Sequence, residues 1–117
     1  MKKILIVEDC PDIRELYHMY LSDYEIYAFD KADLALKNFF TIDPDIFVID
    51  IGLPGVSGLQ LVERLRNEHK VTKPMIIISG EVDFVACEKA LSNGVSQVIQ
   101  KPFDQDELIE AIERYVR

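Results

Sequence analysis

Short, purely apolar runs constrain the fold of this sequence more than any other feature. Residues 46–49 form such a run, which stops at a single carboxylate, Asp50, before a segment rich in glycine and proline. A run of this length, closed by glycine and proline, predicts a buried strand that ends in a loop. We therefore expect Asp50 to be the first residue of this segment to leave the core.

The same pattern recurs along the chain and alternates with segments of helical periodicity. Further strands are predicted at residues 4–7, 25–29, 75–78 and 97–99. Helices are predicted from Pro11, from a cap at Asp30, from a capping box of Ser57 and Gln60, over residues 82–93 with Gly94 behind them, and from a capping box of Asp104 and Glu107. Strict alternation with short connections predicts an α/β fold, with a parallel sheet and helices on both faces. In the helix after Asp30, both Phe39 and Phe40 are placed on the apolar side.

Composition narrows the class of protein. The chain has 117 residues, 49% of them hydrophobic, which predicts one globular domain over residues 1–117. Its net charge of −8 disfavours direct nucleic-acid binding, which needs clustered lysine and arginine. No segment is long enough to span a bilayer, and Cys10 and Cys87, the only cysteines, favour a reduced, cytoplasmic setting.

Polar residues follow the predicted strands at the points where the strands end. Glu8 and Asp9 follow the first strand, Asp50 the third, Ser79 the fourth and Lys101 the fifth. Because parallel strands end at one edge of a sheet, three carboxylates converge there if the first and third strands are neighbours. Mutual repulsion then favours a divalent cation, and oxygen ligands suit Mg²⁺. With a hydroxyl and a lysine beside it, such a group can hold a phosphoryl group that the aspartate attacks.

These motifs resemble those of a known family. Glu8-Asp9, the Asp50-Ile51-Gly52-Leu53-Pro54-Gly55-Val56-Ser57-Gly58 loop, Ser79-Gly80 and Lys101-Pro102-Phe103 are similar to the motifs of receiver domains in two-component response regulators, including the chemotaxis regulators. The resemblance covers the whole chain at matching spacings. It implies the flavodoxin-like strand order 2-1-3-4-5.

The resemblance also implies a metal site and an acceptor. Mg²⁺ would be bound by Glu8, Asp9, Asp50 and the backbone carbonyl of Gly52. Asp50 would accept a phosphoryl group from a phosphohistidine of a sensor kinase or phosphotransfer protein.

Two further residues of the motif have roles in the family. Ser79 would turn toward the phosphoryl group, and Lys101 would pair with it. The peptide bond between Lys101 and Pro102 would be cis, as is usual in the family.

A receiver of this kind would be a phosphorylatable switch and not an enzyme that turns over a metabolite. It would work alone or as a module of a longer protein, as a monomer or weak dimer, without direct contact to nucleic acid or membrane. Its output partner is left open.

Some residues depart from the family pattern. Val98 stands where the family often has an aromatic residue, so we expect switching to rely on Ser79 and the loop after it, or the output surface to change little. Gly52 is smaller than is common there, and Glu81 could orient or repel an attacking water. Cys10 is expected to fill space near the metal site.

Three other functions compete with the switch. An aspartyl-phosphate hydrolase of the haloacid-dehalogenase type wants a second aspartate where this chain has Gly52. A flavin or nucleotide binder wants a glycine-rich or hydroxyl-rich loop after the first strand, where this chain has Glu8 and Asp9. A receiver-like interaction module that no longer uses phosphorylation is disfavoured because all the site positions are filled.

Overall fold

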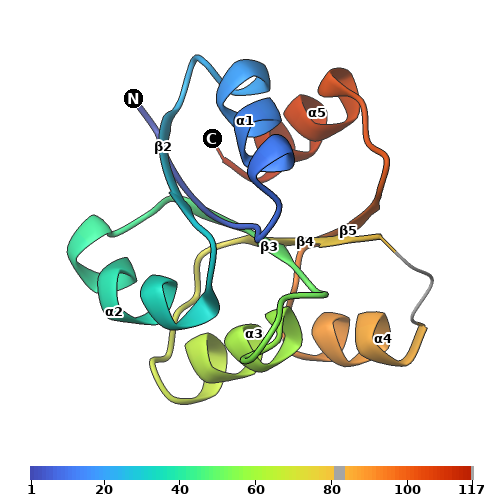
Figure 1. Ribbon diagram of the computed structural model, residues 1–117. Coiled ribbons are helices and arrows are strands. Elements are labelled where there is room, and N and C mark those ends of the chain that lie inside the picture. Colours follow the sequence, from blue (N-terminus) through green and yellow to red (C-terminus); the bar gives the residue numbers. More distant parts are fainter. Residues whose placement is uncertain (81–83, 117) are drawn as a thin grey trace.

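The computed structural model describes residues 1–80 and 84–116. Its sheet has parallel strands in the order β2-β1-β3-β4-β5 (Figure 1). The strands are β1 (Lys3–Val7), β2 (Glu25–Phe29), β3 (Ile46–Asp50), β4 (Met75–Ser79) and β5 (Gln97–Gln100). The predicted flavodoxin-like strand order is therefore confirmed.

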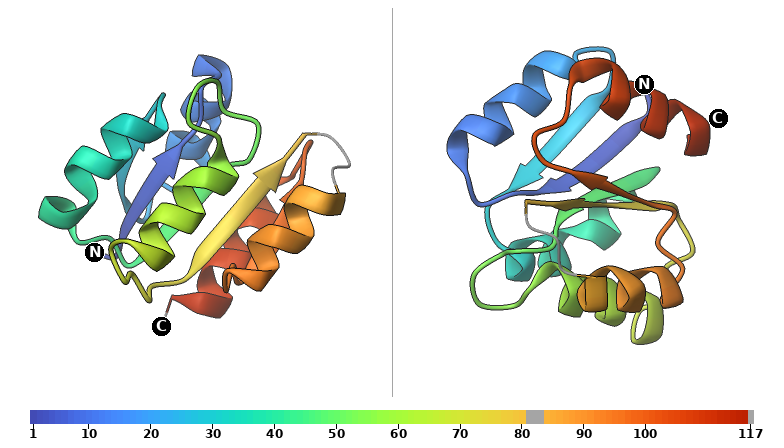
Figure 2. Two further views of the ribbon diagram at one scale, coloured as in Figure 1. Left: turned by 90° about the horizontal axis from the view of Figure 1, so that it is seen from below. Right: turned by 90° about the vertical axis from the view of Figure 1, so that its right-hand side faces the viewer.

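Helices cover both faces of the sheet, as Figures 1 and 2 show. They are α1 (Pro11–Tyr20), α2 (Ala32–Ile42), α3 (Gly58–Asn67), α4 (Phe84–Ser92) and α5 (Gln105–Tyr115). The helices α1 and α5 lie on one face, and α2, α3 and α4 lie on the other. No helix in residues 1–80 and 84–116 is long and apolar enough to cross a membrane.

The apolar strands are explained by this two-sided cover. Side chains alternate between the faces of a strand, so a strand covered on both sides needs apolar residues at every position. In β3, Phe47 and Ile49 belong to the core beneath α2 and α3, whereas Ile46 and Val48 belong to the core shared with α1 and α5. Asp50 ends this strand with only 5% of its surface exposed.

Most helix boundaries agree with the sequence signals. Ser57 Oγ accepts from the Gln60 N–H at 3.1 Å, and Gln60 Oε1 accepts from the Ser57 N–H at 2.9 Å, so this capping box is confirmed. Asp104 Oδ1 accepts from the Glu107 N–H at 2.7 Å, but no return bond from the Glu107 side chain is found among the described residues. Gly94, with φ of 80°, follows α4 as expected.

Other expectations at the helix ends are wrong or lie outside the described residues. The N-cap of α2 is Lys31, and no side-chain cap bond is made there, so Asp30 does not act as the cap. The predicted start of α4 at Val82 lies outside the described residues, and so does Glu81.

The two phenylalanines of α2 have different surroundings. Phe39 is 8% exposed and packs in the core, whereas Phe40 is 86% exposed. Successive residues of an α-helix point about 100° apart, so a narrow apolar face cannot bury both. The expectation that Phe40 lies on the apolar side is wrong.

Candidate functional site

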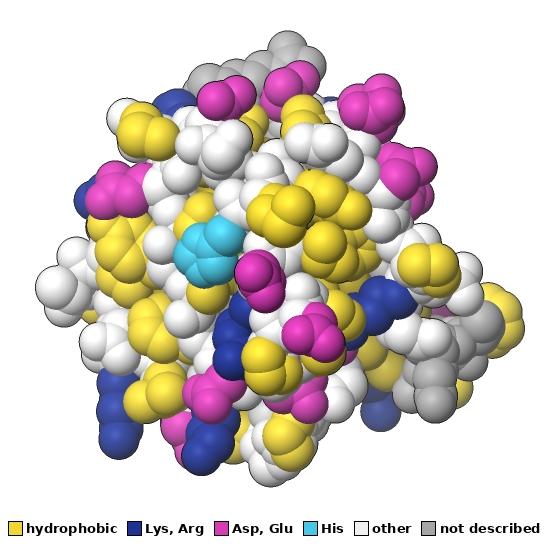
Figure 3. Space-filling view, turned by 45° about the horizontal axis from the view of Figure 1, so that its top comes forward, with side chains coloured by type: hydrophobic (Ala, Val, Ile, Leu, Met, Phe, Trp, Pro, Cys, Tyr) yellow, Lys and Arg dark blue, Asp and Glu magenta, His cyan; other side chains and the backbone are white. Residues whose placement is uncertain are grey.

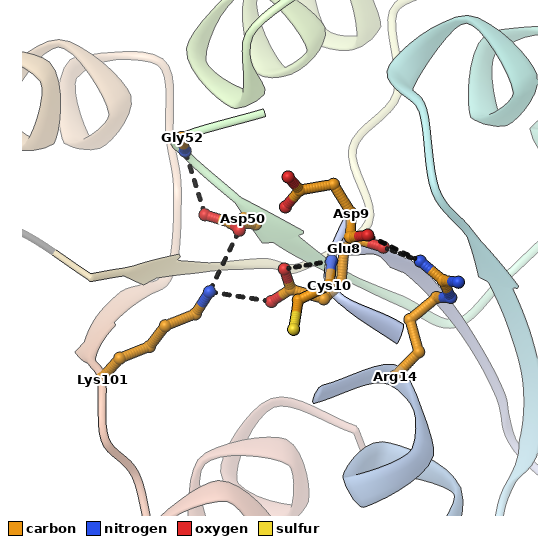
Figure 4. Close-up of polar contacts among 7 residues, drawn as sticks. All are labelled: Glu8, Asp9, Cys10, Arg14, Asp50, Gly52 and Lys101. Carbon is orange, nitrogen blue, oxygen red and sulfur yellow. Dashed lines mark hydrogen bonds and ion pairs between the residues drawn. The ribbon is translucent and has the colours of Figure 1, made fainter. Parts of the chain in front are cut away.

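The predicted site residues come together at the carboxyl edge of the sheet. In the register of β1 and β3, Val7 pairs with Ile49, which brings the next residues, Glu8 and Asp50, side by side. Ser79 ends β4 on the other side of β3, and Lys101 follows β5. Figure 4 shows Asp50 between Glu8 and Gly52, with the Lys101 side chain directed toward both carboxylates.

Three carboxylates form a compact group at this edge. Glu8, Asp9 and Asp50 each offer an oxygen that lies within 4.8 Å of the others. Glu8 and Asp50 are buried, whereas Asp9 is exposed. Oxygen ligands at such separations, with one side open to solvent, fit a hard divalent cation that keeps some of its water.

Lys101 provides the positive charge within this site. Its Nζ lies 3.1 Å from Asp50 Oδ2 and 2.9 Å from Glu8 Oε1. Burial opposes the charged form of this lysine, but the contacts with Glu8 and Asp50 outweigh burial and raise its pKa. Lys101 therefore stays charged at neutral pH. The bond to Pro102 is cis, as expected.

One lysine does not balance two buried carboxylates. Burial and the neighbouring Asp50 raise the pKa of Glu8 to about 7. Its Oε1 is fully buried and lies 2.9 Å from Lys101 Nζ. Among the described residues this oxygen thus keeps an unused acceptor position, which a proton or a metal ion can fill. The donor set therefore fits the predicted Mg²⁺.

The loop after β3 holds the other side of Asp50. The Gly52 N–H donates to Asp50 Oδ1 at 2.9 Å. A Cβ at residue 52 would lie 3.7 Å from the same oxygen, so a larger side chain would cover the carboxylate. The structure places Gly52 beside the carboxylates, and the role of its carbonyl as a ligand stays a prediction.

An open cavity of about 530 Å³ lies against Asp50, and neither Glu8 nor Asp9 lines it. Asp50, Ser79 and Lys101 are among the residues that line it. The cavity is large enough for a phosphoryl group and leaves the Asp50 carboxylate accessible from solvent. Asp50 therefore belongs both to the group of carboxylates and to the cavity that Ser79 and Lys101 line.

Two residues that shape the site were missed by sequence reasoning. Arg14 in α1 donates from Nη1 to the carbonyl oxygens of Glu8 and Asp9, and Gly58 in α3 lies against the backbone of Asp50. A Cβ at Gly58 would lie 2.1 Å from the Asp50 carbonyl oxygen. A glycine in the first turn of a helix is a poor helix former, and that was the available signal. Arg14 gave none, because an arginine on a helix is usually a solvated charge.

Comparison with known proteins decides the family. The family model of the response regulator receiver domain matches residues 4–113. The chain belongs to the response regulator receiver domain family. It is 34% identical to the regulatory protein VanR of Enterococcus faecium over 98% of this chain. It is 38% identical to the transcriptional regulatory protein YxdJ of Bacillus subtilis over 100% of this chain. This receiver domain spans about half the length of those regulators, 50% and 51% respectively.

A solved structure supports the same assignment. The BeF₃-activated N-terminal receiver domain of RstA from Klebsiella pneumoniae superposes with a TM-score of 0.90 at 26% identity, covering 99% of each chain. The resemblance of the sequence to response regulators is thus confirmed, and the protein is a receiver domain of two-component signalling.

Proposed function

We propose that Asp50 is the phospho-acceptor of a Mg²⁺-dependent switch, and that residues 1–117 act as one receiver domain. The donor is a phosphohistidine of a sensor kinase or phosphotransfer protein. This proposal rests on one observation: Asp50, Lys101 and Ser79 line one cavity, and the carboxylates of Glu8 and Asp9 lie next to that of Asp50.

In the proposed transfer, an oxygen of the Asp50 carboxylate attacks phosphorus. The new P–O bond replaces the P–N bond to the donor histidine, and the imidazole leaves with the electron pair of that bond. Lys101 is already within 3.1 Å of Asp50, where its charge stabilises the phosphoryl oxygens. The Ser79 hydroxyl lines the same cavity and can donate to one of them.

The metal would be held beside Asp50 by the group of three carboxylates. Glu8, Asp9 and Asp50, with the Gly52 carbonyl, are the proposed ligands. When bound, Mg²⁺ would supply positive charge that stabilises the phosphoryl oxygens. Glu8 and Asp50 are buried and each contacts Lys101, so both proposed ligands already lie side by side without the metal.

The residues around Asp50 do not support the competing hydrolase function. Such an enzyme needs an acid that protonates the leaving group, at the position occupied here by Gly52. We therefore propose a switch that catalyses only its own phosphorylation and dephosphorylation. Val98 is half-buried, packs against the core beneath α3 and pairs with Ile77 of β4. That switching relies on Ser79 and the loop after it stays a prediction.

The proposed partners are proteins. A sensor kinase or phosphotransfer protein supplies the phosphoryl group in the cytoplasm, and an output protein or domain recognises the modified receiver, which is itself a monomer or weak dimer. On the face shown in Figure 3, acidic side chains are interspersed with hydrophobic ones, and the described Lys and Arg side chains form no continuous patch. This supports protein partners over nucleic acid.

Phosphorylation of matched variants tests the proposal. We expect the wild type to gain the mass of one phosphoryl group from acetyl phosphate in the presence of Mg²⁺, and to lose this reaction when EDTA is added. Asp50→Asn should remain unmodified. Asp43→Asn is the control, because Asp43 is exposed, follows α2 with φ of 52°, and tolerates asparagine in that conformation.

Each result has a definite meaning. A wild type that takes no phosphoryl group and binds no beryllofluoride would show an interaction module without phosphorylation. Modification that survives in Asp50→Asn would place the acceptor elsewhere.

A further inference from the structure

Arg14 holds the segment that carries two of the proposed metal ligands. Its Nη1 donates to the carbonyl oxygens of Glu8 at 2.8 Å and Asp9 at 3.1 Å. Its backbone N–H donates to the carbonyl oxygen of Cys10 at 3.0 Å. One residue of α1 thus bonds three successive carbonyls between β1 and α1, and Figure 4 shows the guanidinium reaching back to those of Glu8 and Asp9.

The two ligands in this segment are held to different extents. Glu8 is fully buried, its N–H donates to the Phe29 carbonyl at 2.9 Å, and its Oε2 accepts from the Cys10 N–H at 3.3 Å. Asp9 is exposed, and within residues 1–80 and 84–116 its only hydrogen bond is the one from Arg14 to its carbonyl oxygen. Arg14 therefore restrains the backbone of Asp9, from which the exposed carboxylate projects.

We propose that Arg14 is a positioning residue that raises the divalent-cation affinity of this site by fixing the backbone of Asp9. The inference rests on the proposed function only in taking Glu8, Asp9 and Asp50 as the metal ligands. Arg14 acts through the carbonyls, and it belongs to none of the ion pairs found among the described residues.

Charge and positioning predict opposite effects of removing this arginine. A guanidinium close to a cation site repels the metal, so charge alone predicts that a neutral side chain strengthens binding. If positioning dominates, the neutral side chain weakens binding, because residues that orient metal ligands typically contribute 10–100-fold to affinity. The sign of the change therefore identifies the role.

Arg66 in α3 provides a matched control, because its contacts lie outside the group of carboxylates. Its guanidinium donates to four backbone carbonyls, of Val71, Lys73, Asn93 and Gly94, at 2.8–3.0 Å. Arg66→Met thus removes the same kind of contact without touching the carboxylates. We expect it to cost stability and to leave metal affinity unchanged.

The experiment measures Mn²⁺ binding through the EPR signal of the free ion, and Mg²⁺ and Ca²⁺ affinities through displacement of Mn²⁺. All three ions take oxygen ligands. We expect Arg14→Met to bind Mg²⁺ about 10–100-fold more weakly than the wild type. Arg14→Lys keeps the charge but loses the planar fork, so its affinity should lie between the two.

Ion selectivity separates positioning from general loss of stability. Mg²⁺ demands near-ideal geometry, whereas Ca²⁺ accepts larger and more flexible sites. Arg14→Met should therefore lose more affinity for Mg²⁺ than for Ca²⁺, and Arg66→Met should keep the wild-type ratio. Circular dichroism confirms that each variant is folded at the temperature used, and if Arg14→Met is not, Arg14→Lys decides.

The outcomes distinguish this inference from the function on which it rests. A wild type that binds no divalent ion refutes the proposed metal site itself. A wild type that binds Mg²⁺, with Arg14→Met binding it equally or more tightly, refutes only the role of Arg14. An unchanged Mg²⁺/Ca²⁺ ratio in the Arg14 variants also refutes it.

Discussion

The buried carboxylate of Glu8 makes metal binding depend on pH. Burial and the Asp50 carboxylate raise the pKa of Glu8 to about 7 in the metal-free protein. A metal ligand must be deprotonated, so a proton and a cation compete for this group. We expect Mg²⁺ affinity to rise with pH across the range between about pH 6 and pH 8.

The size of the effect follows from this competition. With a pKa of about 7, Glu8 is about 90% protonated at pH 6 and about 10% protonated at pH 8. The apparent Mg²⁺ affinity should therefore be about tenfold weaker at pH 6 than at pH 8, which corresponds to about 1.4 kcal/mol of binding free energy. Below pH 6 the slope approaches one proton released for each metal ion bound.

The same shift affects the stability of the metal-free protein. The pKa of Glu8 is higher in the folded state than its model value of 4.5, so the folded state binds the additional proton between the two values. This proton stabilises the folded state, and its contribution is complete below pH 4.5 and is lost as the pH rises through about 7, a change on the order of 3 kcal/mol. Saturating Mg²⁺ should remove this loss, because it binds the ionised form.

Displacement of Mn²⁺ at several pH values measures the affinity. Glu8→Gln is the key variant, since it keeps the shape of the side chain and cannot titrate. It should bind more weakly and show no pH dependence in this range. His18→Gln is the control, because His18 is exposed and lies outside the group of carboxylates, and it should keep the wild-type slope. A wild-type affinity that is flat between pH 6 and pH 8, or an equal slope in Glu8→Gln, would refute the reasoning.

Two further predictions concern stability, measured by urea unfolding. Gly58→Ala should destabilise the protein by about 3 kcal/mol, because the new Cβ would lie 2.1 Å from the Asp50 carbonyl oxygen; Gly80→Ala meets only an ordinary 3.6 Å contact with Lys101, and equal losses in both would contradict the clash. Ser57→Ala should cost about 1 kcal/mol, because it removes the acceptor for the Gln60 N–H at the start of α3. An unchanged unfolding midpoint would show that this cap is redundant.

The fold was predictable because its signals are local and repeated. Apolar strands buried on both faces, such as residues 46–49, require helices on both sides, and right-handed crossovers leave few parallel topologies. The convergence of Glu8 and Asp50 required one further fact, that β1 and β3 are neighbours. The sequence pattern alone left this open, and family resemblance supplied it. The structure gives the register, with Val7 opposite Ile49.

The unpredicted features depend on how elements meet in space. Whether Phe39 or Phe40 faces the core depends on the rotation of α2 against the sheet, which periodicity locates only approximately. The contacts of Arg14 depend on α1 turning back over the end of β1. Gly58 is needed because α3 starts against the backbone of Asp50; a glycine in a first helical turn signals a constraint but does not say which segment causes it.

The three carboxylates of the site are chemically alike, and their surroundings give them different roles. Glu8 has no exposed surface and contacts Lys101 and the Cys10 N–H, so a phosphoryl donor cannot reach it. Asp9 is exposed, but no lysine or arginine among the described residues lies within 4.0 Å of its carboxylate. Asp50 alone of the three lines the cavity and also contacts Lys101. The proposed acceptor is therefore distinguished by access and by a fixed positive charge, and the other two carboxylates are left to hold the metal.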